Sequence, residues 1–471
     1  MSFQEAFEAL KNGDFQSAAP LLEKAAQETG FTSDIINNAY TLALHHTGDK
    51  GRLGDVAFRV GISLLETDPA SAMDYFQRAL FAGLDAGRVR QIGEIFEDWA
   101  AERRFSTEPR TKASGPAKRV AHVVGCLLPG HAPTQYVKML AASLGKHGVE
   151  SLIFTTEWAA SWFFNPQGIA QSQDAGIASA TFIASVDGDF VERAGRVADA
   201  IRSSSVDAAF YHASLSEQIT ARVAAEWPAP LQINVNHGTE MDAALFDGYV
   251  HLFRNALERS RNKDRPAAWI PLASDIEDRL QVQAPATRAS LGIAGAKSVS
   301  ATFGNLYKVA GEAYLSALVE ILQRFPDHFH LFAGAGDVKA IRGQLHSSDV
   351  LSRVRFLGHM ADVAPLLDVV DVYLASFPHS GGHSILEAMG AGKPVVVLGY
   401  PADSHYNSGA ELVGIPDLIA ADRSKYIEIA DRLIRNPSQR ATQSSAAIER
   451  FRSEFRPSAL GTRYIQFLSK L

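Results

Sequence analysis

Apolar residues return at helical spacing through the first hundred positions of the chain. In residues 6–27, AFEALKNGDFQSAAPLLEKAAQ, alanine, leucine and phenylalanine recur every three or four positions on either side of an Asn-Gly-Asp turn. Residues 68–84 repeat the pattern, and Asp68 followed by Pro69 is typical of a helix start. The pattern therefore predicts an all-α domain over residues 1–105.

These helical hairpins resemble degenerate tetratricopeptide repeats. Such repeats usually present a surface to a peptide or a partner protein. The alternative is a helical domain that only packs against its neighbour, and both interpretations stay open at this point.

The spacing changes after a polar stretch with proline and glycine, whose composition is typical of a linker. Short apolar strands now alternate with helical segments, which predicts βαβ units and parallel sheets. The alternation pauses near residue 270 and restarts at SVSATFGN (298–305). We therefore expect two doubly wound halves with a cleft between them, and terminal helices that return across the junction. The expected divisions are a linker over 106–118, halves over 119–270 and 271–450, and terminal helices over 451–471.

Composition limits the class of function. The net charge of −7 argues against general binding to nucleic acid or to an anionic membrane, because both need a cationic surface. The single cysteine, Cys126, excludes an internal disulfide and fits a reducing compartment. The N-terminus lacks the pattern of a signal peptide, and no apolar run approaches the roughly 20 residues that span a bilayer. We expect a cytoplasmic protein without a transmembrane segment.

Two glycine-rich turns enclose a short helical segment in SFPHSGGHSILEAMGAGKPVVVLGY (376–400). The first turn, over 380–384, opens the helix, where exposed amides and the positive end of the helix dipole suit a phosphate. Ordinary turn chemistry is the alternative explanation of these glycines. Glu387 also has two interpretations. With Ser384 it fits an S-x-x-E capping box, or its carboxylate accepts hydrogen bonds from both hydroxyls of a ribose.

A lysine follows the first strand of the same half, in TFGNLYKVA (302–310). Ligands of open α/β sheets gather at such strand ends. Lys308 is suited to neutralise a pyrophosphate as a point charge, and a plain surface lysine is the alternative.

Together these stretches resemble glycosyltransferase family 41, which includes the protein O-GlcNAc transferases and the bacterial adhesin N-glucosyltransferases. The resemblance implies a GT-B fold, in which two Rossmann-like lobes face each other across a cleft. It also implies inverting transfer of a hexose or N-acetylhexosamine from a UDP-sugar to a serine, threonine or asparagine of an acceptor protein. The motifs that carry it are TFGNLYK, SGGHSILEAMGAGKPVV and LVGIPDLIA (412–420), with PGHAPTQYVKML (129–140) and EWPAPLQINVNHGT (226–239) in the first lobe.

The resemblance assigns roles to single residues by position. Lys308 and the turn amides would hold the diphosphate, Glu387 would bind the ribose, and His131 would lie beside the donor phosphates and the acceptor as a candidate base. His237, at another strand end, is a second candidate. The residues expected at the nucleotide are Asn305, Lys308, Ser380, Gly381, Gly382, His383, Ser384 and Glu387.

No metal site and no resident cofactor are expected, because the UDP-sugar is a co-substrate and Asp187-Gly-Asp189 lies in a polar loop. The run EAMGAGKP is also typical of the family 4 retaining glycosyltransferases. The first alternative is therefore a retaining enzyme that acts on a glycan or a small molecule. The second is a non-catalytic protein that binds a nucleotide or a partner.

Overall fold

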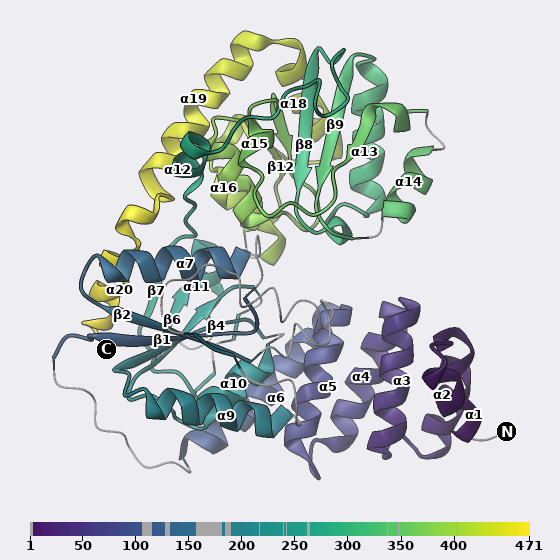
Figure 1. The fold of residues 1–471 in the computed structure, drawn as a ribbon, viewed down its shortest axis with the longest axis vertical. Coiled ribbons are helices and arrows are strands. Elements are labelled where there is room, and N and C mark those ends of the chain that lie inside the picture. The colour runs from purple at the N-terminus through teal and green to yellow at the C-terminus, as the bar shows by residue number, and fades with distance from the viewer. Residues whose placement is uncertain are drawn as a thin grey trace.

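A row of helices leads into two α/β lobes, which are stacked one above the other in Figure 1. The structure is a computed structural model. It describes residues 3–105, 115–127, 132–156, 181–183, 190–215, 217–238, 240–241, 243–260, 264–336, 338–346, 349–402 and 404–471.

Residues 3–105 fold into six helices, as the apolar spacing predicts. The Asn-Gly-Asp turn separates the first two, and the Asp68 carboxylate accepts a hydrogen bond from the Ser71 amide at 3.2 Å, with Pro69 in the first turn. Helices α1–α5 pack around one apolar core. Their bounds are α1 (Phe3–Lys11), α2 (Phe15–Glu28), α3 (Asp34–Thr47), α4 (Lys50–Leu64), α5 (Pro69–Ala82) and α6 (Ala86–Phe105).

The last two of these helices share a core with the first lobe. Phe76 of α5 and Phe96 of α6 belong to the same apolar cluster as Tyr211 and Ile219. The buried Gln77 side chain accepts a hydrogen bond from the Ile219 amide at 3.1 Å. The helical region is therefore joined to the first lobe by packing as well as by the chain.

The first lobe is a seven-stranded parallel sheet in the order β3-β2-β1-β4-β5-β6-β7. Helix α7 lies over one face of the sheet, and α9 and α10 lie over the other (Figure 1). The strand order reverses between β1 and β4, which makes that position the switch point where ligands of such sheets bind. The elements are β1 (Arg119–Val124), α7 (Ala132–Gly145), β2 (Glu150–Thr155), β3 (Thr181–Ile183), α9 (Phe190–Ser203), β4 (Ala208–Ala213), α10 (Gln218–Ala225), β5 (Gln232–Asn236), β6 (Gly248–His251), α11 (Arg254–Arg259) and β7 (Ala267–Trp269).

The second lobe is a six-stranded parallel sheet in the order β10-β9-β8-β11-β12-β13, with its switch point between β8 and β11. The two doubly wound sheets confirm the expected fold class. The elements are α12 (Ile276–Val282), β8 (Ser298–Phe303), α13 (Glu312–Arg324), β9 (His328–Ala333), α14 (Val338–His346), β10 (Val354–Phe356), α15 (Ala364–Leu367), β11 (Val372–Leu374), α16 (Gly382–Gly390), β12 (Val395–Leu398), α17 (Ser408–Val413), β13 (Ile419–Ala420) and α18 (Arg423–Arg435).

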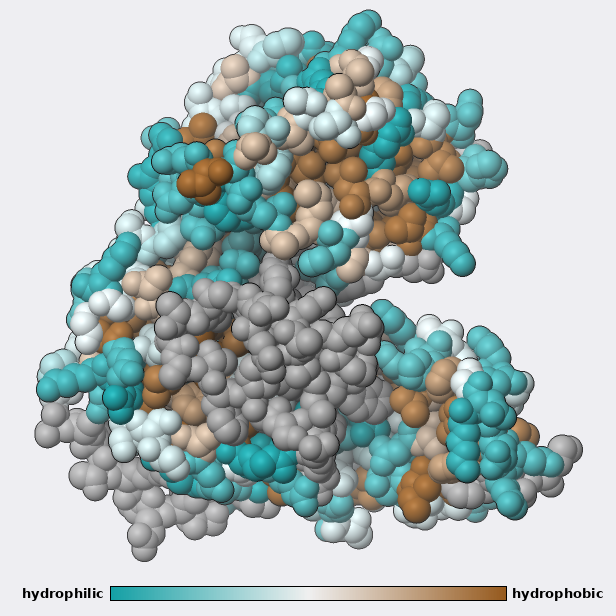
Figure 2. Space-filling model, in the orientation of Figure 1, coloured by the Kyte–Doolittle hydropathy of each residue, from teal (hydrophilic) through white to brown (hydrophobic). Residues whose placement is uncertain are grey.

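Two of the contacts between the lobes are made by helices. Helix α19 (Pro437–Glu454) leaves the second lobe, and α20 (Leu460–Leu468) packs on α7 of the first, where the hydroxyls of Tyr136 and Tyr464 are 3.1 Å apart (Figure 1). The Glu411 carboxylate of α17 also accepts hydrogen bonds from the first two amides of α11, that of Asn255 at 2.9 Å. The surface is hollowed between the second lobe and the N-terminal helices (Figure 2). None of the described helices is both long and apolar enough to cross a membrane.

Candidate functional site

The switch point of the second sheet brings the predicted nucleotide-binding residues together. Asn305 and Lys308 follow β8, and residues 376–384 follow β11, the neighbouring strand. The two turns are in contact, because a Cβ added to Gly304 would lie 3.8 Å from the Ser384 hydroxyl. Residues some 75 positions apart in the sequence thus line one edge of the sheet.

The amino end of α16 has the features of an anion site. The helix begins at Gly382 with Gly381 as its N-cap, and no side chain caps it, so the first amides lie at the positive end of the helix dipole. The Ser380 hydroxyl and Nε2 of His383 are buried here without a hydrogen-bond partner among the described residues. Buried polar atoms rarely stay unpaired in folded proteins, and these two therefore indicate a place for a ligand.

The first lobe reaches this end of α16. A Cβ on Gly382 would lie 3.1 Å from Leu272, in the segment that connects the lobes, and 3.5 Å from the ring of Phe253, which follows β6. A glycine permits this close approach. The candidate site therefore lies where the two lobes meet.

The Glu387 carboxylate contacts basic side chains and takes no part in a capping box. Since α16 begins at Gly382, Ser384 lies inside the helix and the capping-box interpretation is wrong. Oε1 of Glu387 instead accepts from Arg279 of α12 at 2.5 Å and lies 3.5 Å from His383 Nδ1. Burial raises the pKa of the Glu387 carboxyl, but His383 and Arg279 outweigh it and hold that pKa below its usual value. Both of these contacts use Oε1 of Glu387.

Sequence reasoning missed Arg279, which also pairs with Asp275 at 2.8 Å and with Asp362 at 2.5 Å.

We expect Glu387→Gln to weaken UDP binding at least tenfold if Glu387 binds ribose, since a charged acceptor is lost. The matched control is Asp362→Asn, which removes another carboxylate from the same arginine. Calorimetry with UDP decides between the roles. Equal losses in the two variants would mean that Glu387 acts only through Arg279.

Lys308 lies in a partly buried position at the same edge. Burial lowers the pKa of its ammonium below the usual value. Burial thus disfavours the charged form, and a nearby anion would favour it. Lys308 lies in the turn that contacts Ser384, and its diphosphate role stays a prediction.

Of the two candidate bases of the first lobe, only His237 lies within the described residues. His131 lies outside the described residues, as does the Asp187-Gly-Asp189 pair. His237 directly follows β5 and is partly exposed, with Nε2 3.1 Å from Nδ1 of the buried His212. Among the described residues, no group of three or more histidine, cysteine, aspartate or glutamate side chains is arranged to hold a metal ion.

A second residue that sequence reasoning missed, Glu217, lies at the switch point of the first sheet. It follows β4 and packs against Gly125 after β1, where an added Cβ would lie 2.9 Å from its Oε2. That oxygen is buried and has no partner in the described part of the chain, and burial raises the pKa of Glu217 to about 7. The only sequence signal is a glutamate shortly after a strand, which is too common to single it out.

The buried Glu217 carboxyl is expected to make the stability of the folded protein depend on pH. Because the pKa of Glu217 in the folded protein lies above its ordinary value of 4.5, the folded protein binds more protons than the unfolded chain between pH 4.5 and 7 and loses stability as pH rises through that window. The shift is worth up to about 3 kcal/mol. We expect Glu217→Gln to remove this pH dependence, whereas Glu102→Gln, at an exposed position of α6, keeps it. Urea unfolding at pH 5 and pH 8 measures the difference, and an unchanged slope in Glu217→Gln would contradict the prediction.

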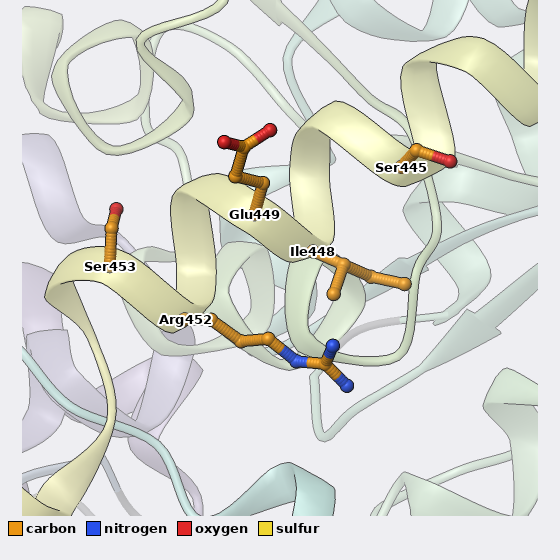
Figure 3. A pocket seen from close by; sticks show the side chains of 5 residues that line it. All are labelled: Ser445, Ile448, Glu449, Arg452 and Ser453. Carbon is orange, nitrogen blue, oxygen red and sulfur yellow. The ribbon is translucent and has the colours of Figure 1, made fainter.

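A surface pocket beside α19 is not part of this site. Its lining comes from one helix, and Nε of Arg452 there is already bound to Glu277 at 2.7 Å. The pocket lies near the carboxyl end of α16, where Gly392 faces Ile448, and so at the opposite end of that helix from Gly382. Its lining residues are Ser445, Ile448, Glu449, Arg452 and Ser453 (Figure 3).

Known proteins resemble parts of this chain in sequence. Residues 298–436, most of the second lobe, match the family described as Glycosyl transferases group 1. A phosphatidyl-myo-inositol mannosyltransferase of Mycobacterium tuberculosis is 37% identical over 118 residues, which are 23% of this chain and 30% of that protein. The protein of the same name from Mycolicibacterium smegmatis is 41% identical over 88 residues, 17% of this chain and 22% of that protein. The chain therefore matches less than a third of the length of these relatives.

Solved structures resemble the chain over a longer range. A mutant O-GlcNAc transferase of Thermobaculum terrenum has a TM-score of 0.62 at 16% identity, covering 99% of this chain and 96% of that one. HepE of Anabaena, solved with UDP and glucose, has a TM-score of 0.59 at 17% identity, covering 75% of this chain and all of that one (100%). At these identities the likeness concerns the fold, which is GT-B.

Proposed function

We propose that the protein is a UDP-sugar-dependent hexosyltransferase that binds its donor between the lobes, mostly against the second. The observation that supports this best is the pair of buried polar atoms, Ser380 Oγ and His383 Nε2, at the amino end of α16. The α16 amides and the Ser380 hydroxyl would bond to the diphosphate, and Lys308 would balance its charge. Oε2 of Glu387 would accept from the ribose.

In this proposal the second lobe stabilises the leaving group and the first supplies a base. The acceptor atom attacks the anomeric carbon and passes its proton to a histidine, His237 or His131. The bond from that carbon to UDP breaks, and its electron pair leaves on the diphosphate next to Lys308. Attack from the opposite face inverts the anomeric centre.

We propose a protein as the acceptor and the N-terminal helices as its docking surface, in a cytoplasmic enzyme. The likeness to the Thermobaculum terrenum O-GlcNAc transferase extends over 99% of the chain and so includes these helices. Helices α1–α5 border the hollow in Figure 2, which suits repeat-like hairpins that guide an acceptor toward the junction of the lobes.

One observation favours a second candidate, a retaining transferase that acts on a lipid or glycan. The residues matched at 37% identity belong to a phosphatidyl-myo-inositol mannosyltransferase. This match covers 23% of this chain and 30% of that protein, which is too little to support its acceptor here. We therefore rank it below the protein acceptor.

The test offers labelled UDP-glucose, UDP-N-acetylglucosamine and GDP-mannose with either soluble lysate proteins or a lipid extract. We expect label in protein from a UDP-sugar, and calorimetric binding of UDP in preference to GDP. Transfer of mannose to lipid would favour the second candidate. A protein that binds neither nucleotide and transfers no sugar would overturn both.

A further inference from the structure

Four polar side chains form a hydrogen-bonded series across one face of the first sheet. Nδ1 of His122 lies 3.0 Å from Nε2 of His212, and Nδ1 of His212 lies 3.1 Å from Nε2 of His237. At the other end, Nε2 of His122 lies 3.1 Å from the Ser151 hydroxyl. The series crosses β2, β1, β4 and the end of β5, which are neighbours in the sheet. It runs from a buried serine to the sheet edge where His237 is partly exposed.

The protons of this series must point in one common direction. A neutral imidazole has one N–H and one lone pair, and each hydrogen bond needs one of each. Either Ser151 donates and every ring donates toward His237, or His237 donates from Nε2 and every ring donates toward Ser151. A single ring cannot change its tautomer without the others.

A protonated His237 is compatible with only one of these directions. It carries N–H on both nitrogens, so its Nε2 needs a lone pair on His212. The direction that ends at Ser151 provides that lone pair. In this direction a neutral His237 keeps its own lone pair on Nδ1, and uptake of a proton there changes no other bond of the series.

The positive charge stays at the exposed end. Burial lowers the pKa of His122 to about 3, and burial together with the neighbouring histidines holds that of His212 well below its usual range. Both rings therefore remain neutral, and each accepts one hydrogen bond and donates one. Tyr136 of α7 packs against the two rings nearest the exposed end, with ring centroids 5.3 Å from His237 and 6.2 Å from His212.

We propose that His237 is the acid–base group of the first lobe and that His212, His122 and Ser151 are positioning residues that hold its ring and provide, at Nδ1 of His212, the acceptor that a protonated His237 needs. The acid–base role rests on the proposed function, whereas the positioning is measurable without turnover. A carboxylate commonly orients a catalytic histidine. Here a neutral ring does so, which avoids a buried charge.

The test is nitrogen-15 NMR of histidine-labelled full-length protein from pH 5 to pH 8. In the wild type we expect His237 to titrate alone and its charged form to donate from Nε2 to His212, with His122 and His212 neutral throughout. In His212→Phe we expect His237 to shift its titration midpoint, and kcat to fall about 10- to 100-fold. An unchanged midpoint in that variant would overturn the positioning.

A second variant tests the same proposal in case His212→Phe does not fold. Ser151→Ala leaves the rings but removes the acceptor at the end of the direction that a charged His237 requires, so the buried Nε2–H of His122 would lose its partner and the His237 midpoint should fall. Ser143→Ala is the control, since this buried hydroxyl bonds to the backbone of residues 457 and 461 and not to the series. We expect the His237 signals to change in Ser151→Ala and to stay as in the wild type in Ser143→Ala. If NMR gives these results but no sugar donor supports transfer, the proposed function and the acid–base role fail and the positioning stands.

Discussion

Replacing Gly334 by alanine is expected to destabilise the second lobe by about 3 kcal/mol or more. Gly334 directly follows β9, next to the turn that carries Asn305 and Lys308. A Cβ at this position would lie 1.7 Å from the carbonyl oxygen of Gly304, which is backbone and has no side chain to turn away. The two strand ends would have to separate, and the turn at the candidate site would move with them.

The matched control is Gly343→Ala, inside α14 of the same lobe. An added Cβ there meets nothing within 4 Å, and alanine favours a helix by about 0.5–1 kcal/mol over glycine. Thermal unfolding should therefore give a lower midpoint for Gly334→Ala and an equal or higher one for Gly343→Ala. A Gly334→Ala variant with wild-type stability would mean that β8 and β9 do not approach each other as closely as described.

The order of strands and helices was predictable because strands of a parallel sheet are buried on both faces. In the sequence such strands are short apolar runs between polar turns, and the predicted strand SVSATFGN (298–305) contains β8. The edge where both turns meet followed from the same alternation, since carboxyl ends of parallel strands share one side of a sheet.

The partners of the site residues were not predictable. Arg279 lies 108 positions from Glu387, and only packing of α12 against α16 brings them together. The capping box was misleading because the Ser384 and Glu387 spacing is the same whether the helix starts there or, as found, at Gly382. The histidine series likewise depends on how four strands, β2, β1, β4 and β5, are aligned in the sheet, and a single sequence does not show that alignment.

Removing the charge of Lys308 is expected to lower kcat/KM by about 10²- to 10³-fold and to weaken UDP binding. Charge develops on the diphosphate as the bond to the sugar breaks, and a cation fixed at the end of β8 stabilises that charge in surroundings poor in water. Lys308→Met retains most of the apolar stem, so packing of the partly buried chain is largely preserved.

Lys393→Met is the control for the loss of a partly buried cation. Lys393 follows the other end of α16, and burial likewise lowers its pKa, with Asp368 and Asp371 acting in the opposite direction. We expect this variant to bind UDP as the wild type does, because the diphosphate would lie at the amino end of the helix. Steady-state kinetics and UDP calorimetry on both variants separate a site effect from a general one. Wild-type UDP affinity in Lys308→Met would remove this lysine from the diphosphate site and leave the α16 amides as its main ligands.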